Sequence, residues 1–538
     1  MTDLDLALPV GLRVPASASP QATSASGATR TLIRGSSLLL LGRLISIAIN
    51  FAVQVITVRY LVKSDYGAFA YGMGIVSTGS TAVLLGLDKS ASRFIAMFQE
   101  RSEPRRVMGT IALAVATVWG LGLSLVVTLY GLRAVVADRV VTDPMAMSLL
   151  LILIALVPVT AFDSLLQRLL AVFVGARAIF FRRHLLGPGL KLAAVLVVVG
   201  TGGNVQLLAW GYLMGGLLGV TAYAVVLLRA WQRQGLLQHL TLRPADVPAR
   251  AVLLYSLPLL SSELVLVLRD SLSVILLGHL QSSNEVAAFQ AVLPVAKLNL
   301  IVMQSFSILF LPLASRLYAR GDRQGMNHLY WQTTLWIALV SFPVFAATVS
   351  LAQPLVHLLF GPQYASSAQV LAVLGVGHFF HASLGFNAMT LRVHDKARYI
   401  MGIDAAALVV GLTLNLLLIP RYGALGAAVG TTGTFILHNV LTNIGLSVAG
   451  TGVQLIHWRF LRVYGVIAAW ALGLFLLQWL MHPPVYLTAA LIALTSLLLI
   501  RTTRHIVRPG EMFPELLRIP LLRSLLASRA DDRRSTPP

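Results

Sequence analysis

The sequence contains no cysteine. This absence excludes disulfides, thiolate metal sites and cysteine nucleophiles, although it does not identify the cellular compartment. Charged residues are also scarce, at 11% of the chain against about 25% in an average soluble domain. Apolar residues make up 57% of the 538 positions, and the mean hydropathy is +0.80. Water therefore cannot be the main solvent of this chain.

Motifs of nucleotide chemistry are missing as well. The sequence has no G-x-x-x-x-G-K-[ST] phosphate loop, which argues against ATP hydrolysis within this chain. The segments between its apolar stretches are too short for a nucleotide-sugar-binding domain or a large catalytic loop. We therefore expect a transporter and not an enzyme, with no cofactor and no metal site. Proton or sodium coupling remains compatible with the sequence.

Fourteen apolar segments follow one another along the chain. Each bilayer crossing needs about 20 mostly apolar residues in a helix, because unpaired backbone amides are not tolerated in hydrocarbon. The segments begin near residues 36, 67, 107, 146, 185, 206, 252, 285, 329, 366, 400, 422, 460 and 484. The sequence therefore predicts an all-α integral membrane protein with about 14 transmembrane helices.

Basic residues favour alternate gaps between these segments. Eighteen Lys or Arg residues occupy the even-numbered gaps, such as Arg105 and Arg106 in the second gap, whereas four occupy the odd-numbered gaps. Cytoplasmic loops retain positive charge, so this bias places both termini in the cytoplasm. The net charge of +21 is then explained by topology and by contact with anionic lipid head groups. We expect no nucleic-acid partner.

An internal repeat divides the chain. The segment Ala91–Ala96 reads A-S-R-x-x-A, and so does Ala314–Ala319. Upstream of these segments, Asp65 is matched by Glu285 at nearly the same offset. Units with an even number of helices insert with the same orientation. We therefore expect two parallel six-helix repeats around a central cavity, followed by two C-terminal helices.

The repeat and the composition together predict six regions. We expect a disordered cytoplasmic tail over 1–30, an N-terminal six-helix half over 31–232, a cytoplasmic linker over 233–250, a C-terminal six-helix half over 251–450, helices 13 and 14 over 451–502, and a basic cytoplasmic tail over 503–538. The first tail has no hydrophobic stretch, so it does not resemble a cleaved signal peptide. The Leu/Arg pattern of the last tail suits either an interfacial helix or a partly ordered segment.

Polar residues inside the apolar segments are the functional candidates, because an ionisable group in a bilayer costs at least about 2.5 kcal/mol. Their spacing places them in stripes on single helix faces. The first helix carries Arg43, Asn50 and Gln54, the seventh carries Glu263, Arg269 and Asp270, and the eighth carries Gln290, Lys297 and Gln304. One interpretation is a water-filled cavity in which Arg43, Arg269 and Lys297 hold an anionic group. The other is a structural network in which Glu263 or Asp270 neutralises Arg269 or Lys297.

Two runs of residues resemble a known family. L-V-K-S-D-Y-G-A-F-A over Leu61–Ala70 and L-L-G-L-D-K-S-A-S-R-F-I-A over Leu84–Ala96 resemble the amino-terminal signature of bacterial polysaccharide flippases. Pro258, Asp270 and Pro312 match the second half of that pattern. These flippases belong to the multidrug/oligosaccharidyl-lipid/polysaccharide exporter superfamily. The resemblance covers both six-helix halves.

The resemblance implies a function in glycan assembly. It implies that an undecaprenyl-diphosphate-linked oligosaccharide crosses the cytoplasmic (inner) membrane by alternating access, for O-antigen, capsule or exopolysaccharide synthesis. Arg43, Arg269 and Lys297 would receive the diphosphate, because phosphate charge must be neutralised in a low-dielectric region. The Asn and Gln side chains of the stripes would contact sugars, and Glu263 or Asp270 would couple transport to protons, sodium or membrane potential. Membrane lipids, a polysaccharide polymerase and glycosyltransferases would be the partners.

Three alternatives remain open. A lipid II flippase of peptidoglycan synthesis also has fourteen helices and a basic cavity. A cation-coupled multidrug antiporter of the same superfamily usually has twelve helices and an acidic cavity. A membrane scaffold for glycosyltransferases needs no buried charge, so alanine substitution of the polar stripes would distinguish it from a transporter.

Overall fold

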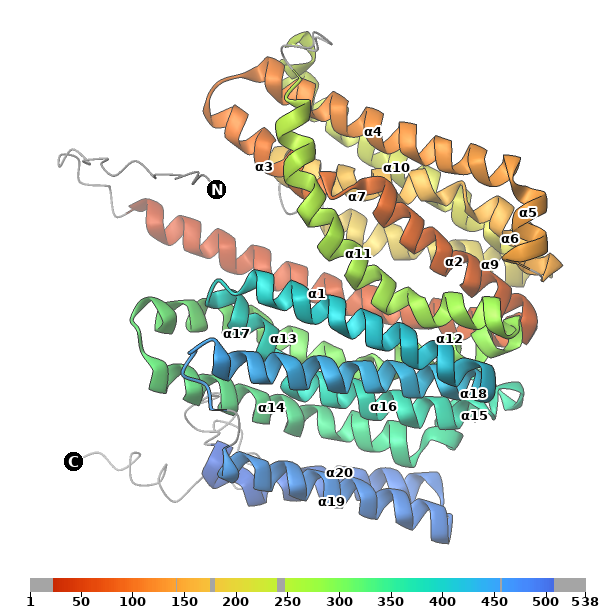
Figure 1. Cartoon of the computed structure of the whole chain (residues 1–538), viewed down its shortest axis with the longest axis vertical. Coiled ribbons are helices and arrows are strands. Elements are labelled where there is room, and N and C mark those ends of the chain that lie inside the picture. The colour runs from red at the N-terminus through yellow and green to blue at the C-terminus, as the bar shows by residue number, and fades with distance from the viewer. Residues whose placement is uncertain (1–22, 142, 175–179, 240–246, 455–456, 508–538) are drawn as a thin grey trace, which may run out of the picture.

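The protein is built from helices throughout the part of the chain that the structure describes (Figure 1). The structure is a computed structural model, and it describes residues 23–141, 143–174, 180–239, 247–454 and 457–507. Within these residues, thirteen helical segments are long and apolar enough to cross a bilayer. The prediction of an all-α membrane protein is confirmed.

The N-terminal half contains six crossings, some of them made of two consecutive helices. Its elements are α1 (Thr23–Tyr60), α2 (Lys63–Leu84), α3 (Leu87–Glu100), α4 (Pro104–Gly131), α5 (Arg133–Arg139), α6 (Pro144–Leu153), α7 (Leu156–Phe173), the π-helix η1 (Phe181–Leu186), α9 (Gly187–Thr201) and α10 (Val205–Arg233). The second crossing breaks at Leu85 and Gly86, whose φ angles of 51° and 70° are left-handed and separate α2 from α3.

The C-terminal half follows the same order and continues into two further helices. Its elements are the short 3₁₀ turn η2 (Leu236–His239) in the linker, α11 (Ala249–Leu280), α12 (Ser283–Ala296), α13 (Leu298–Ala319), α14 (Arg323–Ser350), α15 (Ala352–Phe360), η4 (Pro362–Tyr364), α16 (Ser367–Leu384), α17 (Phe386–Val393), α18 (Ala397–Val448), α19 (Trp458–Met481) and α20 (Val485–Val507). Each of the fourteen predicted segments is covered by these helices.

Helix α18 accounts for two crossings. Its 52 residues would extend about 78 Å as one straight helix, more than twice the hydrocarbon thickness of about 30 Å. The backbone turns sharply at Gly423, where φ is 54° and ψ is −129°. Pro420 lies just before this kink. Dividing α18 there raises the thirteen helical segments to the fourteen crossings that the sequence predicts.

The repeat is visible in the order and length of the helices. α4 and α14 each have 28 residues, and each is followed by one short helix, α5 or α15. Asp65 is the third residue of α2, and Glu285 is the third residue of α12. An acidic side chain in the first turn interacts favourably with the positive end of the helix dipole. These matches in order and length agree with the two six-helix repeats that the sequence predicts.

The described helices extend into both predicted tails. α1 begins at Thr23, within the segment 1–30 that we expected to be a tail. α20 continues to Val507, past the expected start of the C-terminal tail. Residues 1–22 and 508–538, including the predicted interfacial segment, lie outside the described residues.

The two halves lie side by side in Figure 1, with α2 to α10 in one group and α12 to α18 in the other. α1 runs between the groups, and α11 crosses from the first group to the second. α19 and α20 form an outer pair that packs mainly against α14. The turns after α3, α13 and α17 lie at the end where α1 begins, on the left of the view. We call this end the basic side and the opposite end the far side.

Candidate functional site

A cavity of about 570 Å³ lies between α1, α2, α9, α10, α12 and α13, and we call it the central cavity. Its volume is within the range of about 300 to 1,000 Å³ that small-molecule sites occupy. The cavity is lined by six of the predicted substrate-binding residues, namely Arg43, Asn50, Gln54, Gln290, Lys297 and Gln304. The structure thus brings together side chains from the first and the eighth predicted segments.

α1 forms one wall of the central cavity because its polar residues recur on one helix face. Arg43, Asn50, Gln54 and Thr57 all line the cavity. From Arg43 to Thr57 the helix rises about 21 Å, at 1.5 Å per residue. The polar wall therefore covers much of the hydrocarbon thickness of about 30 Å.

The junction of α12 and α13 forms the opposite wall. Lys297 occupies the break between these two helices. Pro294 lies in the last turn of α12, where its missing N–H weakens the helical hydrogen-bond ladder. Lys297 follows the first residue of α12 by fourteen positions, which is about 21 Å along the helix. The ammonium group therefore enters the cavity deep within the membrane-spanning region.

Hydrogen bonds connect the two walls. The Gln54 amide donates to the Tyr66 hydroxyl at 2.6 Å and to the Gln290 backbone carbonyl at 3.3 Å. Toward the basic side, the Arg43 guanidinium donates to the Gln304 side-chain carbonyl. The cavity therefore lies between polar contacts from α1 to α12 and from α1 to α13.

The lining of the central cavity is cationic. Its charged members are Arg43, Lys191 and Lys297, and no carboxylate is among the described residues that line it. The nearest acidic partner is Asp270, whose Oδ2 lies 3.6 Å from the Lys297 Nζ. The side chains of Lys297 and Asp270 are 38% and 58% exposed, so the protein does not enclose this ion pair. An anionic ligand can therefore compete for Lys297.

Sequence reasoning overlooked Lys191, Tyr66 and Tyr212 as cavity residues. Lys191 lies near the beginning of α9, outside the polar stripes of the first, seventh and eighth predicted segments. Tyr66 belongs to the run Leu61–Ala70 but to no polar stripe, and Tyr212 is an isolated aromatic residue. The stripes on neighbouring helices were a usable signal for Asn50 or Gln290, whereas these three residues had none.

Arg269 lies outside the central cavity, which corrects the expectation that it joins Arg43 and Lys297. Successive residues of a helix point about 100° apart, so Arg269 and its neighbour Asp270 face different surroundings. Asp270 is oriented toward Lys297, whereas the Arg269 Nη1 lies 3.7 Å from the Asp404 Oδ1 on α18. Arg269 therefore belongs to a second polar group within the C-terminal half.

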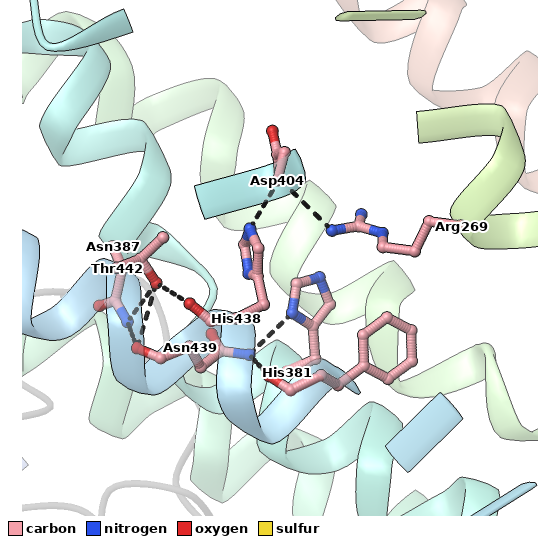
Figure 2. Close-up of polar contacts among 8 residues, drawn as sticks. Arg269, His381, Asn387, Asp404, His438, Asn439 and Thr442 are labelled. Atoms are coloured by element: carbon pink, nitrogen blue, oxygen red, sulfur yellow. Dashed lines mark hydrogen bonds and ion pairs between the residues drawn. The ribbon is translucent and has the colours of Figure 1, made fainter. Parts of the chain in front are cut away.

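This second group is a buried network of Arg269, Asp404, His438, His381 and Asn439, shown in Figure 2. The His438 Nε2 lies 2.9 Å from the same Asp404 oxygen that Arg269 approaches. The Asn439 amide contacts the His381 Nδ1 at 3.0 Å. Asp404 and His438 are far apart in sequence, and they meet because the kink of α18 folds its two arms together. No local pattern could have indicated this pair.

Glu263 belongs to a third location. Its carboxylate pairs with the Lys89 ammonium on α3. Glu263 also lines a cavity of about 320 Å³, which we call the basic-side pocket, together with Asp88 and Arg168. The Arg168 Nε lies 3.3 Å from the Asp88 Oδ2. The two predicted coupling residues, Glu263 and Asp270, therefore contact different cations, Lys89 and Lys297 respectively.

The two halves are joined at the far side by contacts that we call the far-side seal. The Arg59 Nε donates to a backbone carbonyl of α15 at 2.9 Å, and Ser283 donates to the Asp143 carboxylate. The His279 Nδ1 lies 3.0 Å from a carbonyl at the end of α5. Gly67 of α2 lies so close to the backbone of α12 that a Cβ would overlap it.

Two protein-family models match the chain. The model described as polysaccharide biosynthesis protein matches residues 32–318, which is more than half of the sequence. The model described as MatE matches residues 258–417. The two matches overlap at α11 to α13 and together extend into α18.

Two curated proteins are similar over shorter segments. An uncharacterized membrane protein of Methanocaldococcus jannaschii is 27% identical over 169 residues, which is 30% of this chain and 32% of that protein. A probable low-salt glycan biosynthesis flippase of Haloferax volcanii is 19% identical over 170 residues, which is 32% of this chain and 36% of that protein. The chain thus spans about a third of the length of these relatives.

Solved transporter structures share the fold. The lipid II flippase MurJ in an inward closed conformation superimposes with a TM-score of 0.67 at 11% identity, over 87% of this chain and 99% of that one. An inward-facing MATE family multidrug resistance transporter of the MOP superfamily gives a TM-score of 0.62 at 14% identity, over 75% and 95% of the two chains. At such identities the likeness shows the fold alone.

Proposed function

Because the chain belongs to the polysaccharide biosynthesis protein family, we propose that it is a flippase for undecaprenyl-diphosphate-linked oligosaccharides. It carries these units from the cytoplasmic to the outer leaflet of the inner membrane, in the assembly of O-antigen, capsule or exopolysaccharide. The basic side then faces the cytoplasm, in line with the distribution of Lys and Arg among the loops. Both termini are cytoplasmic in this orientation.

The charge of the central cavity carries this proposal. Three cations, Arg43, Lys191 and Lys297, line it without a lining carboxylate in the described part of the chain. A diphosphate brings negative charge into a region of low dielectric, where an unpaired anion is costly. Arg binds phosphate oxygens in a bidentate way, and Lys supplies a compact charge. An organic cation would meet repulsion in the same cavity.

In this proposal the cationic side chains bind the diphosphate, and the amide side chains bind the glycan. Arg43 and Lys297 hold the diphosphate from opposite walls, and Asp270 releases Lys297 when the phosphate arrives. Asn50, Gln54, Gln290 and Gln304 donate and accept hydrogen bonds with sugar hydroxyls. The lipid tail stays in the bilayer. Arg269 stabilises the C-terminal half and does not contact the substrate in this conformation.

Alternating access follows from the position of the far-side seal. In this conformation the contacts of the far-side seal hold the two halves together at the far side. Movement of the two halves breaks the contacts of Arg59, His279 and Ser283 and closes the basic side. Coupling to protons, sodium or membrane potential acts through Asp270 or Glu263, since each carboxylate pairs with a cation that can be exchanged. Glycosyltransferases supply the substrate, and a polymerase consumes it.

A fluorescent undecaprenyl-diphosphate oligosaccharide in proteoliposomes tests the proposal. The assay compares wild-type protein with the double variant Arg43→Gln/Lys297→Gln. Arg320→Gln is the matched control, because Arg320 is exposed at the end of α13 and lines none of the described cavities. A hydrogen bond to a charged group contributes about 1.5 to 3 kcal/mol, so the double variant should flip at least about tenfold more slowly than wild type.

Two further substrates separate the alternatives. Faster movement of a lipid II analogue than of the oligosaccharide would assign the protein to peptidoglycan synthesis. Transport of an organic cation without glycan movement would assign it to multidrug export. A double variant that folds, inserts and flips at the wild-type rate would remove the cationic site from the mechanism, and a scaffold would show no movement of any compound.

A further inference from the structure

A second cavity opens from the central cavity into the N-terminal half. It has a volume of about 290 Å³ and lies between α1, α7, η1, α9 and α10. Both cavities are lined by Ser46, Asn50, Met73, Lys191 and Tyr212, so they adjoin. We call this second cavity the N-half branch. Its outer end meets the basic-side pocket, because Gln167 and Arg183 line both.

The N-half branch has an excess of positive charge. Arg182, Arg183 and Lys191 line it, and Asp163 is the carboxylate among its described lining residues. The Arg182 Nη2 lies 2.8 Å from one Asp163 oxygen, and Gln167 donates to the other at 3.0 Å. Asp163 is thus already satisfied. Among the described residues, neither Arg183 nor Lys191 forms an ion pair.

Arg182 is a fixed part of the wall. Its guanidinium lies between Asp163 and the ring of Tyr223, whose centroid is 4.5 Å away. A Cβ at Gly187 or Gly219 would press against this guanidinium, so both glycines make room for it. Arg182 is the second residue of the π-helix η1, a kind of turn that is frequent at functional sites. The adjacent Arg183 is exposed and remains available for a ligand.

The basic-side pocket provides a contrast. Its carboxylates are Asp88 and Glu263, and both are paired, with Arg168 and Lys89 respectively. Both carboxylates of that pocket are therefore neutralised, whereas Arg183, which also lines it, has no ion pair among the described residues. In the N-half branch charge balance is incomplete, because Arg183 and Lys191, which are both exposed, form no ion pair among the described residues. A negative group from outside the protein would complete it.

We propose that the N-half branch binds an acidic sugar of the translocated glycan, with its carboxylate held by Arg183. This inference rests on the proposed function, since the diphosphate occupies the adjoining central cavity. The volume is close to the lower limit of about 300 Å³ for ligand pockets, which suits a single sugar ring. Tyr212 lies at the junction, where the Lys191 Nζ is 5.9 Å from the centroid of its ring. A neutral sugar fills the branch but leaves Arg183 unpaired.

Two synthetic substrates that differ in one sugar test this inference. Both are lipid-diphosphate trisaccharides, one with glucose and the other with glucuronic acid next to the diphosphate-linked sugar. Binding is followed in detergent by tryptophan fluorescence, and flipping is followed in proteoliposomes. Wild-type protein should bind the acidic compound at least about tenfold more tightly, as expected for a charge-assisted hydrogen bond of 1.5 to 3 kcal/mol.

The variants identify the residue responsible. Arg183→Gln should lose most of the preference for the acidic compound while flipping the neutral one at the wild-type rate, and Arg183→Lys should restore the preference. Arg168→Gln is the matched control, because it removes the same charge from the neighbouring pocket and should keep the preference.

The outcomes separate the two proposals. Equal binding of both compounds by wild-type protein overturns the acidic-sugar site without the need for any variant. A preference that Arg183→Gln leaves unchanged overturns it as well. If neither compound is flipped but acidic binding persists and depends on Arg183, the flippase proposal fails and the N-half branch remains an acidic-sugar site.

Discussion

At the scale of single residues, Arg269 is a cation enclosed by protein with one carboxylate within reach. The side chains of Arg269 and Asp404 are each 16% exposed, and the Arg269 Nε has no partner among the described residues. His438 approaches the same Asp404 oxygen. In a poorly hydrated environment the loss of one partner leaves the other as an uncompensated charge. Asp404 therefore stabilises the folded state mainly by neutralising Arg269.

Asp404→Asn should lower the free energy of unfolding by about 3 kcal/mol, because Asn keeps the size of the side chain and removes its charge. SDS titration in mixed micelles, followed by circular dichroism, measures this change. The control is Glu103→Gln, which removes the charge from an exposed pair with Arg106 at 3.0 Å and should cost less than about 1 kcal/mol. Equal effects of the two variants would contradict the account of Arg269.

Single residues of the central cavity could be predicted from the sequence where polar side chains recur at helical spacing. Asn50, Gln54, Gln290 and Gln304 were found because intervals of seven or eleven residues bring side chains to one face. Arg269 was misplaced because the argument used its proximity to Asp270 and ignored the angle of about 100° between neighbours on a helix. Whether any of these residues binds substrate stays a prediction.

At the scale of elements, the kink of α18 is a joint between two crossings. Gly423 has a φ of 54° and a ψ of −129°, which L-residues with a side chain rarely adopt. Directly after it, the Ala424 N–H donates to the Glu285 carboxylate at 2.6 Å. Glu285 thus satisfies a free donor at the start of the second arm of α18. The same side chain links α12 to α18 at the far side.

Gly423→Ala should reduce stability by about 2 kcal/mol, since an added Cβ strains the backbone and displaces the Glu285 carboxylate. Gly402→Ala in the same helix is the control, because its Cβ meets open space and alanine favours a helix by up to about 1 kcal/mol. The same SDS titration compares the two. A Gly423→Ala protein as stable as the control would mean that the kink needs no glycine.

Elements were the level at which the sequence was most informative. Hydrocarbon thickness fixes the length of each crossing, so fourteen apolar segments led directly to fourteen helices. The breaks at Gly86 and Lys297 were not predicted, because the polar residues there were assigned to faces of continuous helices. The positions of the helix ends in the tails also differed, since α1 starts at Thr23.

At the scale of the whole molecule, the far-side seal decides which cavities are accessible. Arg59, His279 and Ser283 connect elements of opposite halves, and Gly67 allows α2 and α12 to approach closely. Loss of the native contact between Ser283 and Asp143 is therefore a necessary step of alternating access. A covalent bond at the same place should block that step.

A double variant Asp143→Cys/Ser283→Cys, joined by a short thiol-specific crosslinker, should flip substrate at less than a tenth of the rate of the uncrosslinked protein. The protein has no native cysteine, so no background thiol reacts. Each single variant treated with the same reagent is the control and should remain active. Full activity of the crosslinked protein would show that the far side need not open.

The sequence predicts that the two halves have the same orientation in the membrane, and nothing more about how they are arranged. The repeated A-S-R-x-x-A segments indicated two parallel units, because an even number of crossings preserves orientation. They did not indicate the conformation of the molecule. The contacts of Arg59 and Ser283 join residues that are far apart along the chain, and no pairing rule for a single sequence reveals them.

The outer pair α19 and α20 packs mainly against α14, so it is mounted on the C-terminal half alone. When the two halves move relative to each other, the C-terminal half displaces more lipid than the N-terminal half, because it also carries α19 and α20. Hydrodynamic drag then makes the C-terminal half the slower body. An observer fixed in the membrane would see the N-terminal half, which carries the acidic-sugar branch, swing through the larger arc.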